Sequence, residues 1–219
     1  MRIIVSEFMS LDGIVQAPGG ADEDPSGGFA HGGWSFPYFD PEVMGAVVDS
    51  FAASHEVLLQ GSRTYRVSAE AWPGRSGDPF SDWINAARKY VVSDELTEQD
   101  ITWHPTTIVP RDQLVATVQE LRAQPGGGVY VYGSLTIVKA LLAEGLVDEL
   151  VVFIEPILLG GGKRMFPADG EARPLELISA QTAATGVIVA RYRPAGAPPG
   201  GPAEDAAGEG AGTGTEELS

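Results

Sequence analysis

The sequence predicts an α/β protein built on a mostly parallel β-sheet. Short runs rich in Val, Ile, Leu and Tyr alternate with segments whose apolar residues recur at helical spacing. This alternation is typical of a sheet covered by helices on both faces. The last two apolar runs follow each other without a helix between them, which indicates an antiparallel hairpin at one edge. With 219 residues and a hydrophobic content of 43%, the chain suits one globular domain.

Strands and helices are expected in alternation along most of the chain. Before the hairpin, strands are predicted at residues 2–9, 56–60, 89–93, 106–109, 128–132 and 150–154. Helices are predicted between them at residues 41–54, 80–87, 111–124 and 135–144. The two hairpin strands are predicted at residues 175–183 and 187–193.

The chain divides into a folded part and a tail. All the predicted elements fall within residues 1–194. Residues 195–219 consist mainly of Gly, Ala and Pro, and Leu218 is their one large apolar residue. Such a segment cannot bury enough surface to offset the entropy lost on ordering. We therefore expect one domain over residues 1–194 and a disordered acidic tail over residues 195–219.

Charge and composition exclude several kinds of partner. The formal net charge is −16, from 14 basic and 30 acidic residues. Because an acidic surface repels phosphate backbones, we expect no nucleic-acid partner. No apolar run reaches the ~18 residues that a membrane helix needs, and Ser6 and Glu7 interrupt the first run too early for a signal peptide. We expect a cytoplasmic protein with no membrane partner. The lack of cysteine excludes disulfides and thiolate chemistry.

Residues 17–40 form a long insertion after the first strand. Its many glycines argue against a regular element, and its aromatic residues are too numerous for a solvated linker. Loops of this length inside a compact domain are usually functional or disordered. We expect the loop to pack over a cleft, or over a partner subunit, and we predict Trp34 as a substrate-binding residue.

Small and polar residues follow directly after three of the predicted strands. They are Gly61, Ser62, Arg63 and Thr64; Ser93; and Gly133, Ser134, Leu135 and Thr136. The carboxyl ends of parallel strands share one edge of the sheet, where open α/β folds bind ligands. A helix that begins there offers unpaired amides and a positive dipole end to an anion. Each turn alone is consistent with an ordinary helix cap, but together with Arg63 they favour a diphosphate ligand.

The common nucleotide and metal motifs do not fit. Ile157 stands where a P-loop ending at Gly162 needs its first glycine, and Val131 stands where a Rossmann fingerprint needs its third. The three histidines lack the spacing of metal ligands, so we predict no metal site.

Asp12 is the carboxylate that the sequence singles out for chemistry. It follows the first strand in the segment Ser10-Leu11-Asp12-Gly13, where a carboxylate could orient a substrate or pass a proton through water. An Asp before a Gly is also typical of a structural turn. Gly160 and Gly161 lie in a glycine run after a strand, which either lets the backbone approach a ligand or forms a simple turn.

Four segments define a resemblance to a known family. In chain order they are residues 10–13, 61–64, 89–93 and the block 132–166, YGSLTIVKALLAEGLVDELVVFIEPILLGGGKRMF. The block is the most specific, because its glycine turn, Leu-rich helix and Leu-Gly-Gly run occur at family spacing. Over about residues 1–194 the chain resembles the dihydrofolate reductase-like superfamily, in the branch of the C-terminal reductase domain of riboflavin biosynthesis.

The resemblance implies a three-layer dihydrofolate reductase-like fold, a homodimer and a reduced nicotinamide dinucleotide, usually NADPH. Residues 61–64 would contact the pyrophosphate and the adenosine phosphate, and Ser93 would lie near the adenine ribose. Residues 133–136 would cap the pyrophosphate from the other side. Asp12 would lie beside the substrate and the nicotinamide, with Gly160 and Gly161 lining the same cleft.

The chain also departs from the family. Many relatives carry a basic residue where this chain has Asp94, which would repel the 2′-phosphate of NADPH, so NADH also fits. The basic residues with which the riboflavin enzymes bind a sugar phosphate have no match, which indicates a less anionic substrate. The leading hypothesis is an NAD(P)H-dependent reductase that transfers hydride to a small imine, carbonyl or heterocycle, similar to a pterin or a riboflavin precursor. The alternative is a non-catalytic nucleotide- or ligand-binding protein that retains the fold, because no clear acid or base beyond Asp12 is evident.

Overall fold

The structure is a computed structural model that describes residues 1–196. Apart from Ala195 and Gly196, the tail expected at residues 195–219 lies outside the described residues. No helix within residues 1–196 has the length and apolar character needed to cross a membrane.

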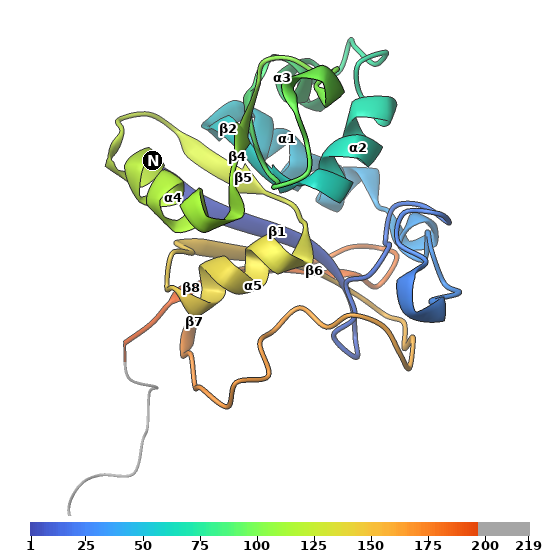
Figure 1. The fold of residues 1–219 in the computed structure, drawn as a ribbon. Helices are drawn as coiled ribbons and strands as arrows, with labels where there is room; N and C mark the ends of the chain where they lie inside the picture. Colours follow the sequence, from blue (N-terminus) through green and yellow to red (C-terminus); the bar gives the residue numbers. More distant parts are fainter. Residues whose placement is uncertain (197–219) are drawn as a thin grey trace, which may run out of the picture.

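One eight-stranded sheet organises the described part of the chain, in the order β4-β3-β2-β5-β1-β6-β8-β7 (Figure 1). The strands are β1 (Arg2–Ser10), β2 (His55–Gly61), β3 (Arg88–Val92), β4 (Thr106–Val109), β5 (Gly128–Val131), β6 (Glu149–Glu155), β7 (Leu175–Thr182) and β8 (Ile188–Pro194). All neighbouring strands from β4 to β6 are parallel. The hairpin of β7 and β8 is antiparallel and joins the sheet through β6, which confirms the predicted mixed sheet.

Helices cover both faces of the sheet and bury one core on each (Figure 1). The helices are α1 (Ala46–Ser54), α2 (Ser62–Ala71), α3 (Pro79–Ala86), α4 (Leu114–Ala123) and α5 (Leu135–Ala143). On one face, Val118 of α4 and Leu141 of α5 are completely buried. On the other, Phe51, Tyr65 and Ile84 of α1, α2 and α3 form the second core. The three-layer arrangement expected from the sequence is therefore confirmed.

Two helical segments differ from the simple prediction. The helix expected from residue 41 begins as a π-helical turn, Pro41–Gly45, before α1. The Asp40 carboxylate accepts hydrogen bonds from the amides of Glu42 and Val43, which fixes this start. The segment after Gly61, which the sequence left open as helix or turn, is the regular helix α2.

Candidate functional site

A cavity of about 1760 Å³ opens at the carboxyl ends of the central strands. The two glycine turns line it together, through Gly61, Ser62, Arg63 and Thr64 and through Gly133, Ser134, Leu135 and Thr136. The turns touch: a Cβ added to Gly61 would collide with the Ser134 side chain, and one on Gly133 would lie 3.1 Å from Thr64 Oγ1. The sequence placed both turns at one edge of the sheet, and the structure brings them into one groove.

The cavity forms where β1 parts from β5. Their pairing ends at Val5 opposite Val131, whereas β1 continues to pair with β6 as far as Ser10 opposite Glu155. The second half of β1 therefore has a neighbour on one side only. Ser6, Glu7 and Phe8 line the cavity at this gap.

Both helices that begin at the groove start without a side-chain cap. The N-cap residue of α2 is Gly61 and that of α5 is Ser134, and neither caps its helix through a side chain. In contrast, Asp78 caps α3 by accepting a hydrogen bond from the amide of Ser81. The first amides of α2 and α5 are thus left to face the groove, an arrangement that suits an anion.

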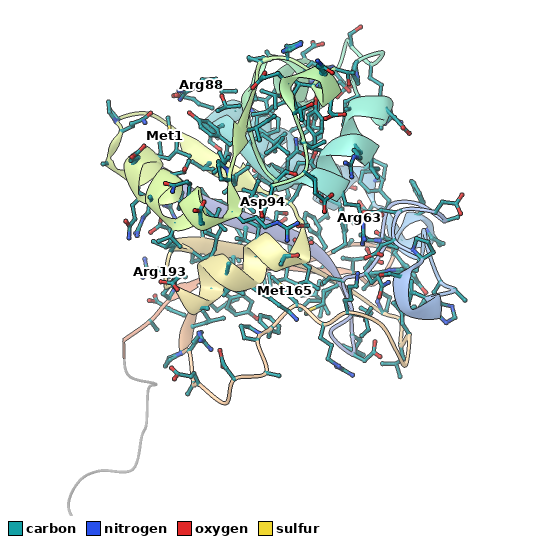
Figure 2. All side chains as sticks on the ribbon, in the orientation of Figure 1. Met1, Arg63, Arg88, Asp94, Met165 and Arg193 are labelled. Atoms are coloured by element: carbon teal, nitrogen blue, oxygen red, sulfur yellow. The ribbon has the colours of Figure 1, made fainter. Side chains whose placement is uncertain are left out.

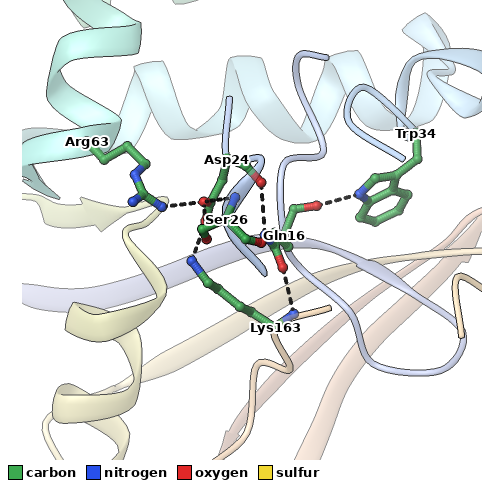
Figure 3. Close-up of polar contacts among 6 residues, drawn as sticks. All are labelled: Gln16, Asp24, Ser26, Trp34, Arg63 and Lys163. Carbon is green, nitrogen blue, oxygen red and sulfur yellow. Dashed lines mark hydrogen bonds and ion pairs between the residues drawn. The ribbon is translucent and has the colours of Figure 1, made fainter. Parts of the chain in front are cut away.

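Arg63 takes part in an ion triad with the 17–40 loop. The Asp24 carboxylate lies 2.5 Å from Arg63 Nη1 and 2.5 Å from Lys163 Nζ (Figure 3). Burial opposes ionisation of Asp24, but hydrogen bonds from Lys163 and Ser26 and the charge of Arg63 hold the pKa of Asp24 below its usual value. Figure 2 shows Arg63 directed from α2 toward this loop. The guanidinium proposed for the diphosphate is therefore shared with an acid of the loop.

The turn after β3 lies at the same end of the sheet, but its side chains are engaged. Ser93 does not line the cavity, although Val92 and Glu95 do. Ser93 Oγ accepts hydrogen bonds from the amides of Glu95 and Leu96. Asp94 pairs with Arg111, with 3.4 Å between Oδ2 and Nε, and accepts a hydrogen bond from the Arg111 amide.

Asp12, Gly160 and Gly161 lie together but outside the residues that line the cavity. Asp12 accepts hydrogen bonds from Ser10 Oγ at 2.6 Å and from the amides of Leu159 and Gly160 at 3.1 and 2.9 Å. These bonds, the one from Ser10 first, lower the pKa of Asp12 to about 2. The carboxylate thus ties the turn after β1 to the glycine run, as a structural turn residue does.

Trp34 is buried beneath the loop instead of facing the cavity. The residue is 6% exposed, and its indole Nε1 donates a hydrogen bond to the carbonyl of Gln16 at 2.8 Å (Figure 3). The loop contributes Phe36 and Phe39 to the cavity lining instead. The expectation that the loop packs over a cleft agrees with this placement, although Trp34 itself does not reach the cleft.

Glu7 is a cavity residue that the sequence reasoning missed. The residue is 8% exposed, and its Oε1 has no hydrogen-bond partner within residues 1–196. Burial, helped by the nearby Glu23 carboxylate, raises the pKa of Glu7 to about 8. The available signal was a single acidic residue inside the apolar run Arg2–Ser10, because strand interiors rarely hold an unpaired charge.

Aromatic rings form much of the wall beyond the groove. Phe8 stacks on Phe153 with 4.8 Å between ring centroids, and Tyr130 stacks on Tyr132 at 5.5 Å. These four residues line the cavity together with Trp72 and Phe80. The Tyr132 hydroxyl hydrogen-bonds Ser68 at 2.7 Å and donates to Gln60 Oε1 at 3.2 Å, so this wall is apolar with a polar margin.

Comparisons with known proteins agree with this architecture. The RibD C-terminal domain model matches residues 1–189, and the chain belongs to that family. The uncharacterized protein YyaP of Bacillus subtilis is 26% identical over 196 residues, which cover 87% of this chain and 94% of that protein. The riboflavin biosynthesis protein RibD of Escherichia coli is 28% identical over 102 residues, covering 47% of this chain and 24% of RibD.

Solved structures share the fold. A putative riboflavin biosynthesis protein from Shewanella sp. PV-4 has a TM-score of 0.63 at 20% identity, covering 89% of this chain and 99% of that one. A dihydrofolate reductase from Enterococcus faecalis, complexed with NADP(H), has a TM-score of 0.55 at 11% identity, covering 88% and 96%. The dihydrofolate reductase-like fold implied by the sequence resemblance is thus confirmed.

Proposed function

We propose that this protein is an NAD(P)H-dependent reductase of small molecules. The observation that carries the proposal is the shared groove, where two uncapped helix N-termini, those of α2 and α5, meet at the split between β1 and β5. Membership of the RibD C-terminal domain family supports a reductase, and a structural neighbour complexed with NADP(H) supports the cofactor class.

The residues of the groove fit a dinucleotide diphosphate. Backbone amides at the start of α2 and α5 would donate to its oxygens, and Arg63 would add one positive charge. These amides and Arg63 would make the groove locally attractive to an anion, although the chain as a whole has a net charge of −16. When bound, the reduced nicotinamide supplies a hydride. The chain's part is to orient the reacting groups and to exclude water from them.

NADPH is the cofactor we propose, with NADH also accepted. Asp94 stands at the end of β3, where it would repel a 2′-phosphate, and Arg111 is held by Asp94. Replacing Asp94 by Asn removes the repulsion and the ion pair that holds the Arg111 side chain. We expect Asp94→Asn to tighten NADPH binding several-fold and to leave NADH binding within twofold. Equal changes for both cofactors would contradict this placement of the adenosine end.

The first test is a titration with NADPH and NADH, followed by energy transfer from tryptophan; Trp72 lines the cavity. A Cβ at residue 61 would lie 3.0 Å from Ser134 Cβ, so Gly61→Ala should weaken binding at least tenfold. Gly196→Ala is the control, because a Cβ there meets no atom of the described chain within 4 Å and residue 196 does not line the cavity. No binding of either dinucleotide by the unmodified protein would overturn the proposal.

Asp12 remains a prediction as a catalytic residue. Its hydrogen bonds to the turn support a structural role, whereas a part in the reaction requires it to reach the substrate. Asp12→Asn separates the two: a lower melting temperature with an unchanged turnover number favours the structural role. A lower turnover number at unchanged stability favours catalysis.

A homodimer in the cytoplasm is the remaining part of the proposal. β7 is an edge strand whose residues are largely solvent-exposed, and Leu175, Leu177 and Ile178 are apolar side chains among them. An exposed apolar edge strand is a template for pairing with another chain, here a second copy. We expect twice the monomer mass by light scattering and a monomer for Leu177→Glu. A monomeric unmodified protein would contradict the dimer.

A further inference from the structure

We propose that Glu7 protonates the nitrogen of a flat C=N substrate that is reduced in this cavity. The inference rests on the proposed function, since it names the substrate class and the proton source of that same site. Glu7 lies where no sequence motif pointed.

The position of Glu7 directs it to the cavity. Glu7 lies two residues after Val5, which is the last β1 residue that pairs with β5. It therefore borders the gap between these two strands. It lines the cavity, yet the residue is only 8% exposed and its Oε1 has no hydrogen-bond partner within residues 1–196. A buried carboxyl oxygen without a partner is costly, and a ligand donor or acceptor in the cavity would satisfy it.

The groups around Glu7 favour its protonated form at neutral pH. Glu23 of the 17–40 loop and Tyr130 of β5 are the titratable groups whose charges interact with it, and neither is basic. The cations that approach this loop, Arg63 and Lys163, are both paired with Asp24. Burial and Glu23 raise the pKa of Glu7 to about 8, so the group holds a proton that it can give away near neutral pH.

The cavity wall defines the substrate class. Stacked rings from Phe8, Phe153, Tyr130 and Tyr132 suit a flat aromatic or heterocyclic body. The cations in this part of the lining, Arg63 and Lys163, are already paired with Asp24, and Glu23 adds a further carboxyl group, which disfavours a phosphate on the substrate. An imine nitrogen is more basic than a carbonyl oxygen and accepts a proton from a carboxylic acid more readily. These features point to an uncharged cyclic imine without a phosphate group.

The step balances as follows. Reduction adds a hydride to the carbon and a proton to the nitrogen of the C=N bond. The hydride comes from the reduced nicotinamide dinucleotide, which is thereby oxidised, and the proton comes from the Glu7 carboxyl group. An amine and a Glu7 carboxylate result, and water returns the proton to Glu7 before the next cycle.

The test uses the full chain, NADPH and 3,4-dihydroisoquinoline, an aromatic cyclic imine. We expect Glu7→Gln to lower kcat by on the order of 100-fold or more, with KM and NADPH affinity within twofold. The unmodified enzyme should lose activity above about pH 8, as Glu7 ionises. The activity of the variant should not fall in this pH range. Glu155→Gln is the matched control, because Glu155 is also buried with a raised pKa but does not line the cavity.

A second measurement does not depend on turnover. Infrared spectra at pH 7 should show a protonated carboxyl band that Glu7→Gln lacks, and the band should shift when 3,4-dihydroisoquinoline is added with NADP⁺. Full activity of Glu7→Gln, equal losses in Glu7→Gln and Glu155→Gln, or an unshifted band would overturn the inference. Binding of NADPH without reduction of the imine would overturn it too, while the dinucleotide site stands. Failure to bind any dinucleotide would instead overturn the proposed function.

Discussion

Glu7 and Asp12 are carboxyl residues of one short segment, β1 and the turn that follows it, and their surroundings are opposite. Asp12 accepts hydrogen bonds from Ser10, Leu159 and Gly160, and its pKa falls to about 2. Glu7 is buried beside the cavity with an unpartnered oxygen, and its pKa rises to about 8. The conspicuous motif holds the carboxylate that is fixed by hydrogen bonds, and an inconspicuous position holds the buried carboxyl group that has an unpartnered oxygen. Hydrogen-bond donors and burial decide the difference, and both come from residues distant in sequence.

The largest expected effect concerns the change in stability between about pH 4.5 and 8. The pKa of Glu7 is higher in the folded chain than in the unfolded chain, so between about pH 4.5 and 8 the folded state binds more protons. The stabilisation is fully present below pH 4.5 and is lost as pH rises to about 8, with a maximum slope of ~1.4 kcal/mol per pH unit. Glu7→Gln should reduce the slope of the free energy of unfolding against pH, measured by urea unfolding at several pH values. An unchanged slope would show that the pKa of Glu7 is not raised in the folded chain.

Glu155 gives an intermediate case. One oxygen accepts a hydrogen bond from Ser35 Oγ at 2.6 Å, the other has no partner within residues 1–196, and burial raises the pKa of Glu155 to about 7. Ser35→Ala removes a donor that favours the charged form, so the pKa should rise further. We expect a loss of ~1–3 kcal/mol in free energy of unfolding at pH 8 and a smaller loss at pH 5. A larger loss at pH 5 would show that the hydrogen bond from Ser35 does not favour the charged form of Glu155.

A smaller effect is expected at acid pH for Asp12. Because its folded pKa is depressed, its stabilisation is present above about pH 3.8 and is lost as pH falls through 2. Asp12→Asn should therefore lower the melting temperature at pH 7 and bring the values of variant and unmodified protein together near pH 2. A constant difference across this range would show that the ionised form contributes nothing.

The smallest effect is expected from the tail. Truncation after Gly196 keeps the hydrogen bond from the Ala195 amide to the Pro174 carbonyl. Because the removed segment is rich in Gly, Ala and Pro, we expect melting temperature and NADPH affinity to stay within error. A clear drop in either would show that the segment contributes to the domain, contrary to the division proposed at residue 194.

The sequence predicted the groove better than it predicted the chemistry. Gly61 and Gly133 follow apolar strands, and parallel strands bring their carboxyl ends to one edge, so local patterns were enough. The cavity role of Glu7 depends on where β5 stops pairing with β1, which is a long-range property of the sheet. Trp34 was expected at the cleft because a high aromatic content indicates a packed loop. The aromatic content does not tell which rings face the cavity and which pack elsewhere. α2 was left open because few of its residues are apolar.

The ion triad around Asp24 has a practical consequence. Asp24, Arg63 and Lys163 come from three distant parts of the chain, and a single carboxylate holds two cations at the rim of the groove. Any polyvalent anion competes with Asp24 for the same cations. Preparations in sulfate, citrate or phosphate buffers should therefore loosen the attachment of the loop and weaken dinucleotide binding, whereas chloride or acetate buffers should preserve both.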